Sequence, residues 1–409
     1  MTSTTAHAPT PLPAATLSGD PLTARHAPLR ALLSRLQCGQ LALTLPDGRR
    51  VQATGALPGP KAELQLHRWR ALARLMLGGD LSLAFAYRDG DWSSPDVTAL
   101  LSLGLANETA LGGLTDARGP ARWLAKLYHR ARANTRRGSR HNIAFHYDLG
   151  NAFYGRWLDS TMLYSSALFE NESDTLEAAQ AQRLDRIVQL LDLKPGMRVL
   201  EIGCGWGTLA ATLAQRCGVE VVGVTLSTEQ LAFARERAAQ WGVADRVDLR
   251  LQDYRDVDGK FDRIVSIEMI EAVGEAYWPT YFGALRERLA PGGHAVLQAI
   301  TIDEAHFQHY RDNPDFIQRC IFPGGMLPTP ERMAAEAQRA GLSMTTEARF
   351  GSGYALTLAE WRRRFLAEWP AIQGQGFDEA FQRLWTYYLC YCEAGFLDGR
   401  IDVGLYRFR

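Results

Sequence analysis

The stretch VLEIGCGWGTLA, residues 199–210, decides the fold of this chain. A short apolar run is followed by glycines at every second position, Gly203, Gly205 and Gly207, and then by residues that favour a helix. This pattern predicts a β-strand, a tight glycine loop and an α-helix. A loop of this kind can hold a phosphate, a dinucleotide or another nucleoside, so the neighbouring residues must decide among them.

The residues around the glycine loop argue against the first two ligands. A P-loop contains Gly-Lys-Ser/Thr, and this loop has no lysine. A dinucleotide fold reads G-x-G-x-x-G with an acidic residue ending the next strand, whereas this loop reads G-x-G-x-G and that strand ends at Thr225. Glu201 would repel a pyrophosphate, but its carboxylate can meet an ammonium or a sulfonium group. S-adenosylmethionine carries both groups, and we expect it as the cofactor.

From about residue 180 onward, short β-rich runs alternate with helical stretches. The runs read MRVLEIGCG, EVVGVTLS, VDLRLQDY, FDRIVSIEM and HAVLQAITI. This alternation predicts an α/β fold with a doubly wound parallel sheet, as in Rossmann-like class I methyltransferases. Gln252 and Asp253 follow the third run, where they can contact an adenine.

The composition is that of an ordinary globular protein. The chain has 409 residues, of which 46% are hydrophobic and 22% are charged, and its formal net charge is zero. A neutral balance favours no nucleic-acid partner. The six cysteines have no zinc-site spacing, so we expect no metal site.

Four segments are expected along the chain. Residues 1–25, rich in Pro, Thr and Ala, predict a disordered tail. Residues 26–120 predict a smaller α+β domain, a candidate for lipid binding, and residues 121–145 a basic linker helix and loop. Residues 146–409 predict the S-adenosylmethionine-dependent methyltransferase domain, with an aromatic C-terminal substrate-binding region.

Three local patterns lie in the α+β domain. Residues 39–55 alternate around a Pro-Asp-Gly turn and predict a β-hairpin. Residues 63–79 have helical spacing and end in two glycines. Residues 80–104 predict a strand, a turn and a helix.

Residues 117–147 contain no Asp or Glu and carry eight basic residues. Apolar residues recur there at helical spacing, which predicts a basic amphipathic helix followed by a basic loop. The helix either packs on one domain as a linker or docks on anionic lipid headgroups. Because the chain shows neither a secretory signal nor a run of 18 apolar residues, we expect a cytoplasmic protein with peripheral association at the inner membrane.

Several longer motifs resemble one family, the cyclopropane-fatty-acyl-phospholipid synthases and their mycolic-acid relatives, over roughly residues 140–405. The motifs are HYDLGNAFYGRWLDSTMLYSSALF, LKPGMRVLEIGCGWG, GVTLSTEQ and IFPGGMLP. The resemblance implies addition of a methyl-derived carbon from S-adenosylmethionine to a double bond in an unsaturated phospholipid acyl chain, forming a cyclopropane. It also implies cofactor contacts from Tyr164, Ser165 and the glycine loop, and contacts from Thr225 and Gln230 to the ribose. The expected partner is an unsaturated phospholipid at a membrane surface, and a homodimer is the assembly to test.

The resemblance further implies a bound bicarbonate as the base. A Glu, a His, a Tyr and backbone groups of a Cys and an Ile hold this ion in the family. Glu271, Tyr354 and Ile300 match three of these positions, Ser166 stands at the Cys position and Gln298 at the His position.

Gln298 can donate a hydrogen bond but cannot carry charge, which leaves three alternatives open. Gln298 still holds the bicarbonate, or the base is Glu271 or Glu268, which stands where the family has Gly, or the proton leaves from a neighbouring carbon. The last route gives methylene-branched, methyl-branched or furan-precursor chains. Two rival functions are a methyltransferase for a soluble small molecule and a non-catalytic lipid-binding homologue.

Alkylation of an isolated alkene requires a strong methyl donor and leaves a carbocation, so the site must be dry and aromatic. The C-terminal third supplies aromatic candidates, each of which could equally be a plain core residue. They are Trp361, Phe365, Trp369, Trp385, Tyr387, Tyr388, Tyr391 and Phe396.

Overall fold

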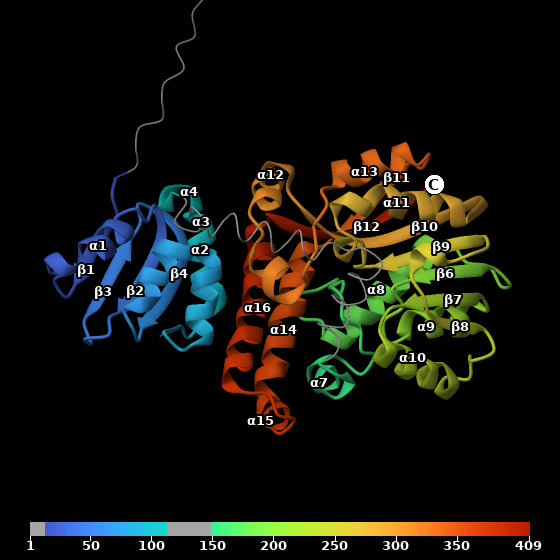
Figure 1. Cartoon of the computed structure of the whole chain (residues 1–409), viewed down its shortest axis with the longest axis horizontal. Coiled ribbons are helices and arrows are strands. Elements are labelled where there is room, and N and C mark those ends of the chain that lie inside the picture. Colours follow the sequence, from blue (N-terminus) through green and yellow to red (C-terminus); the bar gives the residue numbers. More distant parts are fainter. Residues whose placement is uncertain (1–12, 113–148) are drawn as a thin grey trace, which may run out of the picture. The chain divides into compact units, whose positions relative to one another are not determined.

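The computed structural model of the chain describes residues 13–112 and 149–409. The chain divides into two compact units, residues 1–118 and 119–409 (Figure 1). The expected basic linker over residues 121–145 lies outside the described residues, as do the first twelve residues of the expected tail.

The first unit contains a five-stranded sheet with the strand order β1-β3-β2-β4-β5. Its strands are β1 (Thr16–Gly19), β2 (Cys38–Thr44), β3 (Arg50–Thr54), β4 (Leu57–Leu66) and β5 (Trp92–Ser93). The antiparallel pair β2 and β3 is the hairpin that the turn residues predict. The expected tail over residues 1–25 is too long, because β1 pairs with β3, with Leu17 opposite Ala53.

The helices of the first unit differ from the sequence-based expectation in one segment. They are α1 (Ala27–Leu33), α2 (Arg70–Arg88), α3 (Val97–Ala106), α4 (Glu108–Leu111) and the short 3₁₀ turn η1 (Ala24–His26). Residues 63–66 belong to β4, and the strand expected after residue 80 is helical, since α2 continues beyond a kink at Gly79 with φ 68° and ψ −154°. Residues 80–88 contain no β-branched residue and several Leu and Ala, so helix propensity prevails over the apparent alternation.

The second unit contains a seven-stranded sheet with the order β11-β12-β10-β9-β6-β7-β8. Its strands are β6 (Arg198–Ile202), β7 (Glu220–Thr225), β8 (Val247–Leu251), β9 (Phe261–Ile267), β10 (Leu289–Ile302), β11 (Met344–Arg349) and β12 (Ile401–Phe408). The strands β8, β7, β6, β9 and β10 are parallel, and β12 runs antiparallel to both β10 and β11. This arrangement confirms the predicted α/β fold of a class I methyltransferase.

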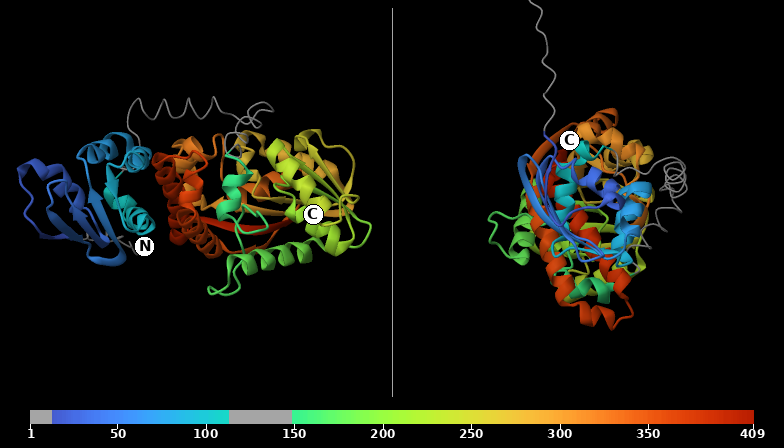
Figure 2. Two further views of the ribbon diagram at one scale, coloured as in Figure 1. Left: turned by 90° about the horizontal axis from the view of Figure 1, so that it is seen from below. Right: turned by 90° about the vertical axis from the view of Figure 1, so that its left-hand side faces the viewer.

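Helices cover both faces of this sheet, as Figure 2 shows from two further directions. They are α8 (Leu176–Leu191), α9 (Thr208–Cys217), α10 (Thr228–Gln240), α11 (Trp278–Arg288), α12 (Glu304–Asp312) and α13 (Pro330–Arg339). The first three pack their apolar residues on one face, and the last three pack on the other, which buries one hydrophobic cluster per face. Short turns connect these elements. They are η2 (Tyr254–Asp256), η3 (Ile270–Ala272), η4 (Glu275–Tyr277) and the π-turn η5 (Ile317–Ile321).

The remaining helices of the second unit are rich in aromatic residues. They are α7 (Asn151–Trp157), α14 (Gly351–Ala367), α15 (Trp369–Gln373) and α16 (Glu379–Asp398). The helices α14 and α16 lie side by side (Figure 1). Among the described residues, no helix is both long and apolar enough to cross a bilayer.

The carboxyl ends of β6, β7 and β9 meet at one edge of the sheet, because these strands are parallel neighbours. Ligands of doubly wound sheets bind at this edge, beyond the strand ends. The candidate site is therefore sought in the loops that follow these strands.

Candidate active site

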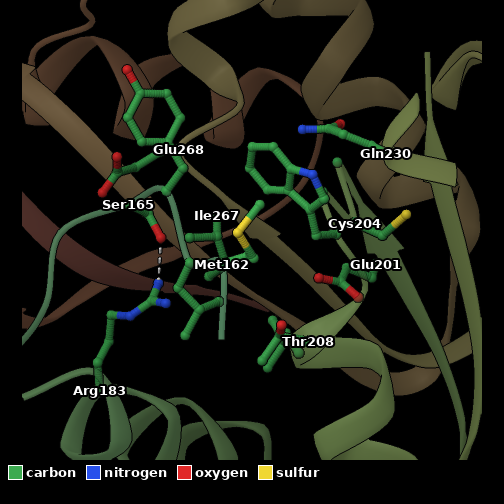
Figure 3. Close-up of a pocket in the computed structure, with 15 residues that line it drawn as sticks. Met162, Ser165, Arg183, Glu201, Cys204, Thr208, Gln230, Ile267 and Glu268 are labelled. Carbon is green, nitrogen blue, oxygen red and sulfur yellow. Dashed lines mark hydrogen bonds between the residues drawn. The ribbon is translucent and has the colours of Figure 1, made fainter. Parts of the chain in front are cut away.

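A pocket lies beyond the end of β6 (Figure 3). The empty space inside it, including the part open to solvent, is about 560 Å³. Its walls come from the segment before α8, from α8 itself, from the end of β6 with the glycine loop and the start of α9, from the start of α10 and from the end of β9. The lining residues are Met162, Leu163, Tyr164, Ser165, Arg183, Glu201, Gly203, Cys204, Gly205, Trp206, Thr208, Leu209, Gln230, Ile267 and Glu268.

The glycine loop needs its glycines for two physical reasons. Gly203, Gly205 and Gly207 all have positive φ angles, of 84°, 50° and 81°, which L-residues with side chains rarely adopt. In addition, a Cβ at Gly207 would lie 2.7 Å from the Cβ of Ala234 in α10. The loop therefore lets α9 begin close to α10, with backbone exposed to the pocket.

Glu201 at the end of β6 is buried, with 3% of its surface exposed. Its Oε2 has no hydrogen-bond partner among the described residues, and burial raises the pKa of this carboxyl to about 8. A buried acceptor beside the pocket is suited to an ammonium group, whose charge would lower that pKa. This geometry suits a contact between Glu201 and the aminoacyl end of S-adenosylmethionine, which remains a prediction.

Tyr164 and Ser165 line the pocket from the segment before α8. The hydroxyls of Tyr164 and Tyr388 lie 2.7 Å apart. The Oγ of Ser165 accepts a hydrogen bond of 2.8 Å from Nη1 of Arg183 (Figure 3). Both residues are therefore held in place by side chains from α16 and α8.

Thr225 and Gln230, which the family resemblance assigns to the ribose, contact each other. Oγ1 of Thr225 donates a hydrogen bond of 3.1 Å to Oε1 of Gln230. Gln230 lines the described pocket, whereas Thr225 lies behind it at the end of β7. Their ribose contacts remain a prediction.

Gln252 and Asp253 follow β8 and do not line the described pocket. The backbone N–H of Gln252 donates to the carbonyl oxygen of Thr225 at 3.1 Å, which ties the end of β8 to the end of β7. Asp253 forms an ion pair of 2.6 Å with Arg255. An adenine contact from Asp253 would have to share its carboxylate with that arginine, so this assignment also remains a prediction.

Glu268 lies directly after β9, and three hydrogen-bond donors converge on its carboxylate. Its Oε1 accepts from the backbone N–H of Ser166 at 2.8 Å and from Nε2 of Gln298 at 2.7 Å. Its Oε2 accepts from the hydroxyl of Tyr354 at 2.7 Å. Ser166, Gln298 and Tyr354 stand at three of the five positions that the family resemblance assigns to a bicarbonate.

The backbone of Glu268 has a φ angle of 48°, in the left-handed region that favours glycine. Such strain in a residue with a side chain costs on the order of 1 kcal/mol and is common where a side chain is held for function. Burial raises the pKa of Glu268, while hydrogen bonds from Tyr354, Ser166 and Gln298 oppose the rise by stabilising the carboxylate. Glu268 is therefore a partly buried residue whose carboxylate oxygens accept from a prepared set of donors.

Glu271 lies in η3, and its surroundings differ from those of Glu268. Its Oε1 accepts from the backbone N–H of Ile300 at 2.5 Å, and its Oε2 is buried with no partner among the described residues. Burial raises the pKa of Glu271 to about 8, and the negative charge of Glu268 adds to the rise. Glu271 thus holds its own proton near neutral pH.

Arg183 is a pocket residue that the sequence-based analysis does not single out. It lies in α8 with 1% of its surface exposed, and Nη1 donates to Ser165 and, at 3.4 Å, to Oε1 of Gln298. In sequence it looks like one more charged helix residue. The available signal is its position at i+4 from Ala179 and i−4 from Ile187, on the buried stripe of α8.

An aromatic cluster adjoins the donors around Glu268. Trp361 packs with Tyr354 and Tyr164 at ring-centre distances of 6.1 and 5.2 Å, and Tyr354 packs on Phe396 at 4.5 Å. Trp385 joins the cluster through Trp157 at 6.0 Å. Most of the predicted aromatic candidates are buried, while Trp369 and Tyr391 are partly exposed.

The structure brings together most of the predicted catalytic residues. Three of them, Ser166, Gln298 and Tyr354, contact Glu268. The other two, Glu271 and Ile300, contact each other. Within residues 13–112 and 149–409, no group of three or more His, Cys, Asp or Glu side chains is placed to hold a metal ion.

Comparison with known proteins gives a family match over most of the second unit. The sequence profile of the family described as Mycolic acid cyclopropane synthetase matches residues 134–405. The chain is 39% identical over 396 residues to a tuberculostearic acid methyltransferase of Mycobacterium tuberculosis, covering 93% of this chain and 87% of the relative. It is 38% identical over 328 residues to a cyclopropane-fatty-acyl-phospholipid synthase of Escherichia coli, covering 79% of this chain and 81% of the relative.

Solved structures agree with the sequence matches. The mycolic acid cyclopropane synthase CmaA1, complexed with SAH and CTAB, superimposes with a TM-score of 0.61 at 31% identity, over 66% of this chain and 97% of that chain. The cyclopropane synthase MmaA2 from Mycobacterium tuberculosis gives the same values. The chain therefore belongs to the mycolic acid cyclopropane synthetase family and is an S-adenosylmethionine-dependent methyltransferase of fatty acyl chains.

Proposed function

We propose that this enzyme methylates the double bond of an unsaturated phospholipid acyl chain and that Glu268 is the base that removes the proton. The observation that carries this proposal is the convergence of Ser166, Gln298 and Tyr354 on the Glu268 carboxylate. A carboxylate held by three donors has a fixed position and a stabilised ionised form. The side chain thereby takes the place that a bicarbonate would need.

Bicarbonate fits this site poorly for the same reason. Oε1 and Oε2 of Glu268 already accept from Ser166, Gln298 and Tyr354, which stand at three of the five positions that the family resemblance assigns to the ion. A second anion beside Glu268 would also be repelled by its charge. We therefore include no bicarbonate in the proposed reaction.

Different residues of the site serve cofactor binding and proton removal. When bound, S-adenosylmethionine supplies a methyl group as an electrophile, and the residues suited to hold it are Glu201, Ser165 and the glycine loop. Methylation of one alkene carbon leaves a positive charge on the other carbon. The aromatic faces of Trp361 and Tyr354 are suited to stabilise that charge and to exclude water.

Glu268 then accepts one proton, and the electrons of the broken C–H bond determine the product. If the proton leaves the new methyl group, these electrons close a three-membered ring and a cyclopropane chain results, which is our first candidate. If the proton leaves a neighbouring chain carbon, the electrons form a new double bond in a methyl-branched chain. The match over 93% of this chain to a tuberculostearic acid methyltransferase favours this second candidate.

The test combines purified protein, methyl-labelled S-adenosylmethionine and liposomes of an unsaturated phospholipid. Mass spectrometry and proton NMR of the released fatty acids distinguish a cyclopropane from a methyl-branched alkene. The wild type is expected to form labelled acyl chains, whereas Glu268→Gln loses at least about a hundredfold in rate because the amide cannot accept the proton. Retention of the wild-type rate in Glu268→Gln, with cofactor binding intact, would overturn the proposal.

We also propose a peripheral association with the inner membrane, on its cytoplasmic side. The support is the sequence of residues 117–147, which has eight basic residues and no acidic one. Each basic residue near an anionic membrane surface contributes about 1 kcal/mol. Sedimentation analysis would decide whether the chain also forms a homodimer.

A further inference from the structure

Arg183 occupies a position between the cofactor pocket and the proposed base. Its guanidinium extends from α8 into the pocket, and Nη1 donates to Oγ of Ser165 at 2.8 Å (Figure 3). The same nitrogen approaches Oε1 of Gln298 at 3.4 Å. One buried cation therefore contacts a residue on the cofactor side and a residue that binds Glu268.

The contact with Arg183 reinforces the direction in which the Gln298 amide faces. With Oε1 toward the guanidinium, Nε2 donates to Glu268 at 2.7 Å and to the carbonyl oxygen of Ser166 at 3.2 Å. In the flipped orientation, the amide NH₂ would face the NH groups of Arg183, and the amide oxygen would face the carboxylate. Both contacts would be repulsive, so Arg183, together with the two acceptors, favours the orientation that serves Glu268.

The charge of Arg183 is not neutralised by an ion pair within the described residues. Nε and Nη2 of Arg183 are buried there without a hydrogen-bond partner. Burial lowers the pKa of Arg183 to about 10, which leaves the guanidinium protonated at neutral pH, and the largest opposing influence is the Glu268 carboxylate. The field of this cation therefore acts on Glu268 in a poorly solvated site.

We propose that Arg183 is a positioning residue for the base: it orients the Gln298 amide toward Glu268 and supplies the positive charge that keeps the Glu268 carboxylate ionised. This inference rests on the proposed role of Glu268. It also accounts for a glutamine at the position where the family resemblance places a histidine, since the cation is contributed from α8.

The groups that face this pair from the surrounding elements are few. Tyr354 from α14 donates to Glu268, and Glu271 from η3, whose own pKa is raised by burial and by the Glu268 charge, faces it as a neutral acid near neutral pH. Asp159 and Glu201 act on Arg183 from the segment before α8 and from β6. Removing the guanidinium leaves Glu268 among neutral and negative groups, so the protonated form of Glu268 becomes more stable relative to the ionised form.

The experiment measures the ionisation of Glu268 directly and through the reaction. Infrared difference spectroscopy of the ligand-free protein follows the carboxylic-acid stretching band of Glu268 as a function of pH. This band is assigned to Glu268 because it is absent from Glu268→Gln. In parallel, the single-turnover methyl-transfer rate is measured against pH with phospholipid liposomes. Arg183→Met is expected to move the infrared midpoint and the acidic limb of the rate upward by about one pH unit, because a nearby opposite charge is lost while the three hydrogen bonds to Glu268 remain.

Arg183→Lys is the conservative variant. It keeps a charge but lacks the planar fork that fixes the Gln298 amide, so the acidic limb returns toward the wild-type position while the plateau rate stays reduced. The control is Arg263→Gln, a buried arginine at the start of β9 that donates to the carbonyl oxygen of Leu191, and we expect its acidic limb to match the wild type.

The outcomes separate two failures. If Glu268→Gln is inactive but Arg183→Met and Arg183→Lys both titrate like the wild type, Arg183 has no influence on the base and the inference is wrong. If Glu268→Gln retains the rate, the proposed function fails instead. Calorimetry with S-adenosylhomocysteine completes the test. If Arg183→Met loses affinity for this ligand but the acidic limb of its pH–rate profile does not shift, Arg183 is a cofactor-binding residue and the inference is wrong.

Discussion

Glu268 and Glu271 are three residues apart, yet their carboxyl groups have different surroundings. Glu268 accepts three hydrogen bonds and lies near the charge of Arg183, whereas Glu271 accepts one from Ile300 and keeps a buried oxygen without a partner among the described residues. Environments of this kind separate the pKa values of neighbouring acids. Glu268 is therefore suited to accept a proton, and Glu271 to remain neutral beside it.

The raised pKa of Glu271 has a consequence for stability. The group keeps its proton in the folded state up to about pH 8, but loses it near its ordinary pKa when the chain unfolds. Unfolding therefore releases a proton between these values, and the free energy of unfolding of the ligand-free protein falls as pH rises, by about 1.4 kcal/mol per pH unit for this group.

We expect Glu271→Gln to remove this contribution, so that its urea midpoint falls less than that of the wild type between pH 5 and pH 8. The matched control is Glu236→Gln, which changes an exposed glutamate in α10 and should follow the wild-type pH dependence. Parallel pH curves for Glu271→Gln and the wild type would show that Glu271 is ionised in the folded protein.

Sequence reasoning reaches this site unevenly, for physical reasons. Motifs place Glu271, Gln298 and Tyr354, but they do not reveal which of them share one carboxylate, because that depends on the three-dimensional approach of β9, β10 and α14. Glu268 is visible as a departure from the family residue. The sequence gives almost no signal for the role of Arg183, since a single arginine on a helix is usually solvated.

At the scale of elements, the glycine loop joins β6, α9 and α10. Gly207 combines a φ of 81° with a close approach to Ala234, whereas Gly205 has a φ of 50° and open space where a Cβ would lie. Gly207→Ala should therefore suffer both backbone strain, about 1–2 kcal/mol, and overpacking, about 1–3 kcal/mol.

Gly205→Ala is the matched variant, because it suffers the strain alone. Urea unfolding of the ligand-free proteins should show Gly207→Ala to be the less stable of the two by about 1–3 kcal/mol. Equal losses in the two variants would mean that α10 moves away without cost, so that the loop is not fixed by packing.

The elements also show where local patterns are sufficient. The strands β6–β10 lie where the alternating runs predict them, because each run is buried in a parallel sheet and bounded by turn residues. The strand predicted at residues 80–88 is wrong, because an alternation of small and large residues fits both a strand and a helix. The continuation of α2 across Gly79 depends on tertiary packing. The pairing of β1 with β3 is likewise non-local and leaves no pattern in four residues.

At the scale of the whole molecule, the charge distribution predicts where the protein meets its substrate. Reversal of Arg136, Arg137 and Arg140 to Glu should weaken binding to vesicles that contain anionic lipid by at least about tenfold, since each basic residue contributes about 1 kcal/mol. Binding to vesicles of zwitterionic lipid should change little. Co-sedimentation with the two vesicle types measures both quantities.

The control for this prediction makes the same change in net charge elsewhere. Arg216, Arg339 and Arg363 have side chains that are 47%, 73% and 67% exposed, and their reversal to Glu alters the net charge equally. If the control variant loses as much affinity as the first, general electrostatics and not residues 117–147 attract the protein to the membrane.

The central claim is that Glu268 replaces an external base, and its most direct test is the methyl-transfer rate with and without bicarbonate. Glu268→Gly suits this test, because glycine adopts the observed φ of 48° without strain and frees the three donors. The account predicts that the wild type keeps its rate in bicarbonate-depleted buffer, and that Glu268→Gly is at least about a hundredfold slower there and regains activity when bicarbonate is added. A wild type that needs bicarbonate, or a Glu268→Gly variant that is fully active without it, would contradict the account.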